Sequence, residues 1–553
     1  MQRLHTLSGN VVDVVSRTIR PATIYVENGI ISDIVPNDEQ YDTYILPGFI
    51  DAHIHIESSM LVPAEFGRLA SVHGTIATVS DPHEIANVLG IEGVRYMIEN
   101  ARQTPLKIYF GASPCVPATN FETAGATLSP ADIDQLFAQY DLPYLSEVMN
   151  YPGVLNADPE IYEKIAIAQR YGKVIDGHAP GLRGEAARQY IAAGISTDHE
   201  CFTLDEALDK LSYGMKIIIR EGSAAKNFEA LAPLFAQYAD RLMLGSDDKH
   251  PNDLVISHID ELVRRALAKG YNLFDVLQAA CVNPVRHYAL SVGLLQIGAP
   301  ADCIVTNRVD ARMKVLQTYI NGNLVAENGK TLLAYSDATA PNQFCTSYKT
   351  ERDFCLYPPA HSTHANVIEA LEGQLITHCQ TMPFATNAQG EAIADVERDM
   401  LKIAVVNRYA DAPPAIGFIR NFGLQQGAMA SSVAHDSHNI IAVGTSDEAL
   451  CRVVNALIQY GGGLAAVADN GSEQVLPLPV AGLMSTSNGY QLAQQYEQID
   501  HFVKQLGSPL TAPYMTLSFM ALLVIPSLKL SDKGLFDGNI FAFKPLFCPT
   551  TPQ

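Results

Sequence analysis

Short apolar runs alternate with longer amphipathic segments across residues 47–290. The intervening segments, such as IEGVRYMIENARQ and DPEIYEKIAIAQR, carry apolar residues at helical spacing. An apolar run bounded by turn residues predicts a buried parallel strand, and the helical pattern after it completes a β/α unit. Eight such units predict an α/β protein built on a (β/α)8 barrel. The expected strands are ILPGFIDAHIH (45–55), TIATVSDP (75–82), LKIYFGAS (106–113), LPYLSEV (142–148), GKVIDGHAP (172–180), ISTDHE (195–200), KIIIREGS (216–223) and RLMLGSDD (241–248).

Two further regions flank the predicted barrel. Residues 1–46 and 291–335 alternate short β-rich runs with turns, and YVENGIISDIV and YINGNLVAENG share a strand, an Asn-Gly turn and a second strand. We expect these segments to form one split β-sandwich domain. Residues 340–553 mix strand and helix patterns and predict an α+β C-terminal domain. Its most apolar stretch, LSFMALLVIP (517–526), is too short to cross a bilayer and is expected to be a buried strand or helix.

Composition narrows the functional classes. The chain has 553 residues, 48% hydrophobic and 17% charged, with a net charge of −22 and a pI near 5.1. This acidity argues against binding to nucleic-acid phosphates or to anionic membrane surfaces. The beginning, MQRLHTLSGNVVDVV, lacks the apolar core of a signal peptide, and the nine cysteines contain no CxxC pair. We therefore expect a cytoplasmic protein with a small-molecule substrate, and a homo-oligomer.

Several predicted strands end in histidine or carboxylate residues. In a (β/α)8 barrel the carboxyl ends of the strands build the active site. His53 and His55 are two residues apart in one strand, so their imidazoles point to the same side. Imidazole and carboxylate together suit Mn²⁺ and Fe²⁺. Taken singly, each of these residues is also compatible with a loop or a turn cap, but their recurrence at successive strand ends favours a site for two metal ions. The set is His53, His55, His83, Glu147, His178, His199 and Asp247.

Longer motifs at these positions resemble the amidohydrolase superfamily and, within it, the adenine deaminase family. They are DAHIHIESSML (51–61), SDPHEIANV (80–88), SDDKHP (246–251) and SSVAHDSHNIIAVG (431–444), so the resemblance spans nearly the whole chain. It implies hydrolysis of adenine to hypoxanthine and ammonia, as in purine salvage, by a hydroxide bound to two divalent ions, Mn²⁺ or Fe²⁺. It also implies that His53, His55 and Asp247 hold one ion, that Glu147 bridges, and that His178 and His199 hold the second.

Other residues are candidates for contacts with the purine. Asp247 is expected to take the proton of the attacking hydroxide and pass it to the amine. Because adjacent residues of a strand point to opposite sides, we expect only Asp247, and not Asp248, to face the metals. Glu84 is a candidate proton donor to the ring, or alternatively a cap of the next helix. The candidate substrate-binding residues are His83, Arg220, Glu221, Ser223 and, in the C-terminal domain, His435, Asp436 and His438.

Two other functions are compatible with parts of this pattern. The barrel residues alone also fit the ring opening of a cyclic amide, as in dihydroorotase-like or hydantoinase-like enzymes. A metal-binding relative without turnover is the second alternative, although such a relative is expected to lose ligands, and here the set is intact. The motif HDSHN can also be read as an internally hydrogen-bonded turn. The SDPHE loop and the C-terminal block favour adenine.

Overall fold

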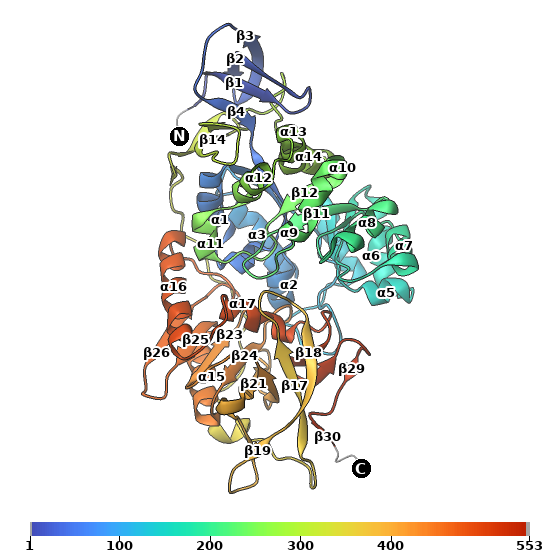
Figure 1. The fold of residues 1–553 in the computed structure, drawn as a ribbon, viewed down its shortest axis with the longest axis vertical. Helices are drawn as coiled ribbons and strands as arrows, with labels where there is room; N and C mark the ends of the chain where they lie inside the picture. Colours follow the sequence, from blue (N-terminus) through green and yellow to red (C-terminus); the bar gives the residue numbers. More distant parts are fainter. Residues whose placement is uncertain (1–2, 549–553) are drawn as a thin grey trace.

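Eight parallel strands form a closed barrel at the centre of the molecule, as the sequence pattern predicts (Figure 1). The computed structural model describes residues 3–548, so the outermost residues of both predicted flanking domains, 1–2 and 549–553, lie outside the described residues. The barrel strands are β5 (Phe49–Ile54), β6 (Thr75–Ser80), β7 (Lys107–Phe110), β8 (Tyr144–Val148), β9 (Val174–Gly177), β10 (Thr197–Asp198), β11 (Lys216–Arg220) and β12 (Leu242–Gly245).

Backbone pairing closes these strands into a ring. Parallel ladders run through β5–β6–β7, β8–β9 and β10–β11–β12. The bridge between Ala112 and Leu145 joins β7 to β8, and the amide of Ser196 donates to the carbonyl of Ile175 between β9 and β10. A bridge between Ile54 and Asp247 joins β12 to β5. The carboxyl ends of all eight strands therefore surround one mouth.

The amphipathic segments form helices outside the barrel. Buried apolar residues of these helices, such as Met97 and Leu262, pack against the strands. The helices are α1 (Pro63–Ala70), α2 (His83–Leu89), α3 (Ile91–Ala101), α4 (Pro130–Gln139), α5 (Tyr151–Leu155), α6 (Pro159–Arg170), α7 (Gly184–Ala192), α8 (Leu204–Ser212), α9 (Phe228–Leu231), α10 (Phe235–Tyr238), α11 (Pro251–Ile256), α12 (Ile259–Ala268), α13 (Leu273–Leu277) and α14 (Asn283–Tyr288).

The two β-rich flanking segments meet in a single eight-stranded sheet at one end of the molecule (Figure 1). Strands β4 and β13 pair, which joins the part before the barrel to the part after it. All three Asn-Gly turns of this sheet, at 28–29, 321–322 and 328–329, have positive φ at each residue, as tight hairpin turns require. The sheet contains β1 (Thr6–Asp13), β2 (Thr18–Glu27), β3 (Ile30–Pro36), β4 (Tyr44–Pro47), β13 (Cys303–Thr306), β14 (Val315–Ile320), β15 (Asn323–Glu327) and β16 (Lys330–Thr331).

The C-terminal block lies at the opposite end and covers the barrel mouth (Figure 1). Its nine-stranded sheet contains β17 (His364–Ala370), β18 (Thr377–Pro383), β21 (Leu401–Val406), β22 (Ala415–Arg420), β23 (Ala428–Ser431), β24 (Ile440–Gly444), β25 (Gly463–Val467), β26 (Glu473–Pro477) and β30 (Phe547–Cys548). Smaller sheets are β19 (Ala385–Thr386) with β20 (Ala392–Ile393), and β27 (Leu528–Ser531) with β28 (Gly534–Asp537) and β29 (Ala542–Phe543). The helices are α15 (Asp447–Tyr460), α16 (Gly489–Gln505) and α17 (Pro513–Ser518).

Hydrogen bonds attach this block to the barrel. The amide of Gly489, at the start of α16, donates to Glu65 of α1 at 3.0 Å, and the amide of Ser485 donates to the carbonyl of Met60 at 2.8 Å. Asn439 donates to the carbonyl of Thr123 in the loop after β7 at 2.8 Å. The apolar stretch 517–526 is buried, as predicted, and runs from the end of α17 through a 3₁₀ turn beneath the mouth.

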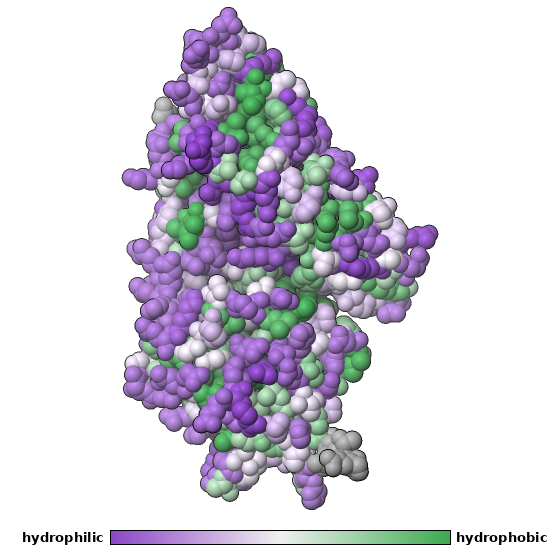
Figure 2. All heavy atoms as spheres, viewed as in Figure 1, coloured by the Kyte–Doolittle hydropathy of each residue, from purple (hydrophilic) through white to green (hydrophobic). Residues whose placement is uncertain are grey.

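The visible surface is mostly hydrophilic, in keeping with the acidic composition (Figure 2). Hydrophobic residues gather on the part formed by the first sheet, where Ile19 and Tyr25 of β2 and Ile30 and Val35 of β3 are about two-fifths exposed. Among residues 3–548, no helix combines the length and apolar character needed to cross a bilayer.

Candidate metal centre at the barrel mouth

Histidines from four strand ends lie together at the mouth. His53 and His55 of the first barrel strand have ring centroids 4.9 Å apart. The His53 ring stacks on His199, from the end of β10, with centroids 3.9 Å apart, and His55 lies 4.5 Å from His83 after β6. All of these side chains are at most 4% exposed. Because their strands are far apart in the sequence, only barrel closure brings the rings together.

Glu147, at the end of β8, is at the centre of the cluster. Its Oε1 lies 3.2 Å from His55 Nε2. Its Oε2 lies 2.8 Å from His178 Nδ1 and 3.3 Å from His199 Nε2. The two oxygens therefore face different histidines, which is the arrangement that a carboxylate bridge between two ions requires. Burial alone would raise the pKa of Glu147, but His178, His199 and His55 hold that pKa well below its usual value.

Asp247 completes the cluster from the end of β12. Its Oδ1 lies 3.3 Å from His55 Nε2 and 3.6 Å from His53 Nε2, while Oδ2 accepts a hydrogen bond from Arg220. Burial opposes ionisation of Asp247, but the Arg220 guanidinium and the histidines keep its pKa well below the usual range. Asp247 is thus held as a carboxylate at the cluster.

The donor set fits divalent metal ions. His55 Nδ1 faces the backbone carbonyl of Asp81 at 3.2 Å, and because a carbonyl can only accept, Nδ1 donates. In the neutral ring, Nε2 then presents a lone pair toward the carboxylate oxygens of Glu147 and Asp247. Lone pairs facing one another in a buried site are stabilised by a cation between them. Both ring nitrogens of His53 and Nε2 of His178 are also buried without a hydrogen-bond partner among residues 3–548.

Several groups of side chains are close enough to hold an ion, and two of them share Glu147. Those two are His55, Asp81, His83 and Glu147, and Glu147, His178 and His199. Others are His53, His199 and Asp247; Glu84, His435 and His438; and His83, Glu84 and Asp436. The family resemblance pairs His53 with His55 on one ion, whereas here His53 stacks on His199.

The C-terminal motif HDSHN reaches this mouth. His435 and His438 both contact the carboxylate of Glu84, which lies in the first turn of α2. Asp436 Oδ1 lies 3.7 Å from His83 Nε2. The motif is also an internally hydrogen-bonded turn, since the amide of His438 donates to the carbonyl of Ala434. Both interpretations of the motif therefore hold, and the turn presents its side chains to the barrel.

Two expectations for neighbouring residues are corrected. No side chain caps α2, so Glu84 faces the C-terminal histidines instead of capping that helix. Asp248 also lines the pocket, although we expected only Asp247 to face it, because Asp247 has a φ of 56° and interrupts the alternation of the strand. Asp248 accepts a hydrogen bond from Ser58 and lies 3.9 Å from His435 Nε2.

The residues after β11 are engaged elsewhere, contrary to the expectation that they read the purine edge. Arg220 is bound by the carboxylates of Glu200 and Asp247. Glu221 pairs with Arg265, and Ser223 donates to Asp253. None of the three is among the residues that line the pocket.

Sequence patterns alone missed several residues of the pocket. Glu200 directly follows His199 and Asp81 precedes His83, so both adjoin a motif that was recognised. Phe519 and Leu522 come from the apolar stretch 517–526, for which the sequence predicted burial only. The pocket is lined by His55, His83, Glu84, Glu147, Met149, His178, His199, Glu200, Asp247, Asp248, Leu375, His435, Asp436, Phe519 and Leu522. Its volume of about 20 Å³ is close to the space that one water molecule needs.

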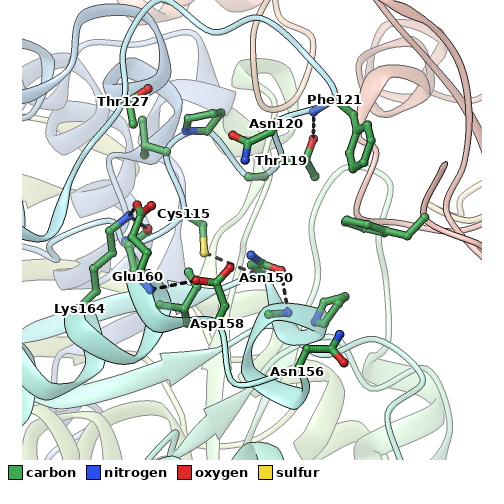
Figure 3. Close-up of a pocket in the computed structure, with 18 residues that line it drawn as sticks. Cys115, Thr119, Asn120, Phe121, Thr127, Asn150, Asn156, Asp158, Glu160 and Lys164 are labelled. Carbon is green, nitrogen blue, oxygen red and sulfur yellow. Dashed lines mark hydrogen bonds and ion pairs between the residues drawn. The ribbon is translucent and has the colours of Figure 1, made fainter. Parts of the chain in front are cut away.

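A larger cavity of about 490 Å³ lies beside the loops after β7 and β8 (Figure 3). Its one cationic side chain, Lys164, donates to the carbonyl of Pro114 and pairs with Glu160. The thiol of Cys115 faces the amide of Asn150, and burial raises its pKa to about 11. No histidine of the described residues lines this cavity, whereas His55, His83, His178, His199 and His435 line the smaller pocket.

Comparison with known proteins agrees over nearly the whole length. The sequence profile of the amidohydrolase family matches residues 44–325, and that of the adenine deaminase C-terminal domain matches residues 374–542. A protein of Sulfurovum sp. (strain NBC37-1) named adenine deaminase is 57% identical over 538 residues, covering 97% of this chain and 98% of that protein. Proteins with the same name from Salinibacter ruber and Methanosarcina mazei are 53% and 49% identical, each covering 98% of this chain and 99% of its own length.

Proposed function

The chain belongs to the adenine deaminase family of the amidohydrolases, and we propose that it hydrolyses adenine to hypoxanthine and ammonia, a reaction of purine salvage. The observation that carries this proposal is the buried cluster around Glu147, which the C-terminal block covers with side chains of its own. A barrel cluster alone would fit many amidohydrolases. In this chain the C-terminal domain adds the side chains of the HDSHN motif to the same mouth, and this addition favours adenine deamination over other amidohydrolase reactions.

We propose two divalent ions, Mn²⁺ or Fe²⁺, as the cofactor. The ligands would be His53, His55, Glu147, His178, His199 and Asp247. Such ions, when bound, lower the pKa of a water molecule to roughly 7 and so supply a nucleophile near neutral pH. His55 contributes a tautomer already fixed by the carbonyl of Asp81.

Asp247 would act as the catalytic base. Its carboxylate takes the proton of the attacking oxygen and delivers it to the departing amine. Arg220 supports this role because its hydrogen bond orients Asp247 and keeps it ionised in the resting protein. Arg220 would therefore position the base without touching the substrate.

The purine would lie between the metal cluster and the C-terminal block. His83, His435 and Asp436 line that side of the pocket, and Phe519 and Leu522 offer apolar faces. Glu84, which also lines the pocket, would fix the orientation of His435, and His438 would hold Glu84 from outside the lining.

The proposed division of labour follows the three parts of the chain. Residues 47–290 would form the catalytic barrel. Residues 1–46 with 291–335, expected to form a β-sandwich domain, would support it from the far end as one β-sheet domain. Residues 340–553 form the α+β domain that completes the pocket. This division is supported by the single sheet that joins the two flanking segments.

A substrate screen tests the proposed function. Protein supplied with Mn²⁺ is expected to release ammonia and hypoxanthine from adenine and to leave hydantoin and dihydroorotate intact. Opening of a cyclic amide without ammonia from adenine would favour the cyclic-amide alternative. Bound metal without turnover of either class would favour the non-catalytic alternative.

A further inference from the structure

Glu84 accepts hydrogen bonds on both sides and has no proton to give. Its Oε1 faces His435 Nδ1 and its Oε2 faces His438 Nε2. The amide of Ala434 donates to His438 Nδ1 at 3.2 Å, so that nitrogen carries the lone pair and Nε2 carries the proton. His438 therefore donates to Glu84. A carboxylate in this setting is an acceptor and not the donor to a purine ring.

Among Glu84, His435 and His438, the nitrogen without a hydrogen-bond partner is Nε2 of His435. Its Nδ1 faces Glu84, so the proton on that side is committed. Its Nε2 is buried without a hydrogen-bond partner among residues 3–548, and Asp248 Oδ1, at 3.9 Å, is too far for a hydrogen bond. The ring is stacked on Phe519 with centroids 4.5 Å apart, which fixes its direction at the pocket wall.

The two carboxylates near His435 favour its doubly protonated form. Burial lowers the pKa of the imidazole, but Glu84 and Asp248 raise it to about 9. Nε2 then carries a proton at neutral pH. A buried N–H without an acceptor destabilises the folded state, and an acceptor on a bound ligand would remove that destabilisation.

We propose that His435 is a catalytic residue that donates its Nε2 proton to N1 of adenine, the ring nitrogen beside the carbon under attack, with Glu84 as its positioning partner. This inference rests on the proposed deamination. It transfers the donor role expected of Glu84 to a residue of the other domain, so the ring can be activated only when the C-terminal block is docked on the barrel.

The proton balance of the step closes. The attacking species is a hydroxide, left when a water molecule has given its first proton to His435. Its oxygen forms a bond to C6 while the electron pair of the C6–N1 double bond moves to N1, which takes the proton of His435. The C6–amine bond then breaks, and the amine leaves as ammonia with the proton that Asp247 took from the attacking oxygen. His435 regains a proton from the next water as it ionises. Adenine and water give hypoxanthine and ammonia.

A binding experiment isolates the N1 contact. Purine and 1-deazapurine, which lacks N1, are titrated calorimetrically into Mn²⁺-loaded protein, so the result does not depend on turnover. A hydrogen bond from a charged donor predicts that purine binds about ten- to a hundredfold more tightly. In His435→Asn, whose amide replaces Nδ1 but not Nε2, both ligands are expected to bind equally. His378→Asn, at an exposed histidine of the same domain, should keep the preference.

Separate readouts distinguish the possible failures. Equal binding of purine and 1-deazapurine to the unsubstituted protein, or an unchanged preference in His435→Asn, overturns the donor role. The Glu84→Gln variant keeps His435 but removes the negative charge beside it. The preference of this variant for purine over 1-deazapurine should therefore fall as well. An undiminished preference in this variant also overturns the proposal. Ammonia release from adenine by the unsubstituted protein is assayed independently, and its absence would count against the proposed function alone.

Discussion

Replacing Asp247 by Asn tests the assignment of the catalytic base against its neighbour. The amide keeps the size of the side chain but cannot take the proton of the attacking oxygen. General base catalysis contributes typically ~10²–10⁴-fold, or about 3–5 kcal/mol of barrier, so kcat should fall by that factor. The Oδ1 contacts to His55 and His53, at 3.3 and 3.6 Å, can be kept by an amide oxygen, so part of the metal should remain bound.

Asp248→Asn is the matched control. Its charge acts on His435 over 3.9 Å, where the Coulomb interaction is about 4 kcal/mol at an effective dielectric constant of about 20. Because Glu84 still compensates His435, only part of that interaction is lost, and we expect a decrease in kcat of about tenfold. The assay is kcat for adenine with metal content measured on the same samples. An inactive Asp248→Asn beside a nearly normal Asp247→Asn would refute the assignment.

Other features of the structure predict distinct outcomes. Glu147→Gln removes the charge shared by the three neighbouring histidines, so metal content and activity should fall together; full metal loading would show that Glu147 is not the bridge. Adenosine should be deaminated far more slowly than adenine, because a ribose must fit beneath Phe519 and Leu522; equal rates would contradict a pocket closed by the C-terminal block. Burial lowers the pKa of Lys529 from 10.5 to about 7, so its destabilising effect is full below pH 7 and is lost as the pH rises toward 10.5. The thermal midpoint should therefore rise from pH 7 to pH 9 by more in the unsubstituted protein than in Lys529→Met, with a difference in stability of at most ~1.4 kcal/mol per pH unit; parallel curves would contradict the shift.

The barrel could be predicted because each strand is a buried apolar run, and burial on both faces leaves a clear pattern in the sequence. The metal cluster could be predicted because the carboxyl ends of all barrel strands surround the same mouth, so histidines and carboxylates at those ends lie close together. In both cases the information is local to each strand.

The remaining contacts depend on partners that are distant in the chain. Arg220 was expected to face the substrate, yet Glu200 and Asp247 occupy its guanidinium. Glu84 is bound by histidines 351 and 354 residues away, which no local pattern reveals. Asp248 lines the pocket because the backbone at Asp247 leaves the strand conformation. Hydrogen-bond partners and backbone reversals of this kind emerge only in the folded chain.

The metal dependence of adenine deamination decides whether this cluster is the catalytic centre. Protein stripped of metal by a chelator should release no ammonia from adenine. Titration with Mn²⁺ or Fe²⁺ should restore the rate in proportion to the metal bound and saturate near about two equivalents per chain. Full deamination by protein with a reproducible metal content near zero would contradict the assignment of Glu147 and its histidines as the site of the chemistry.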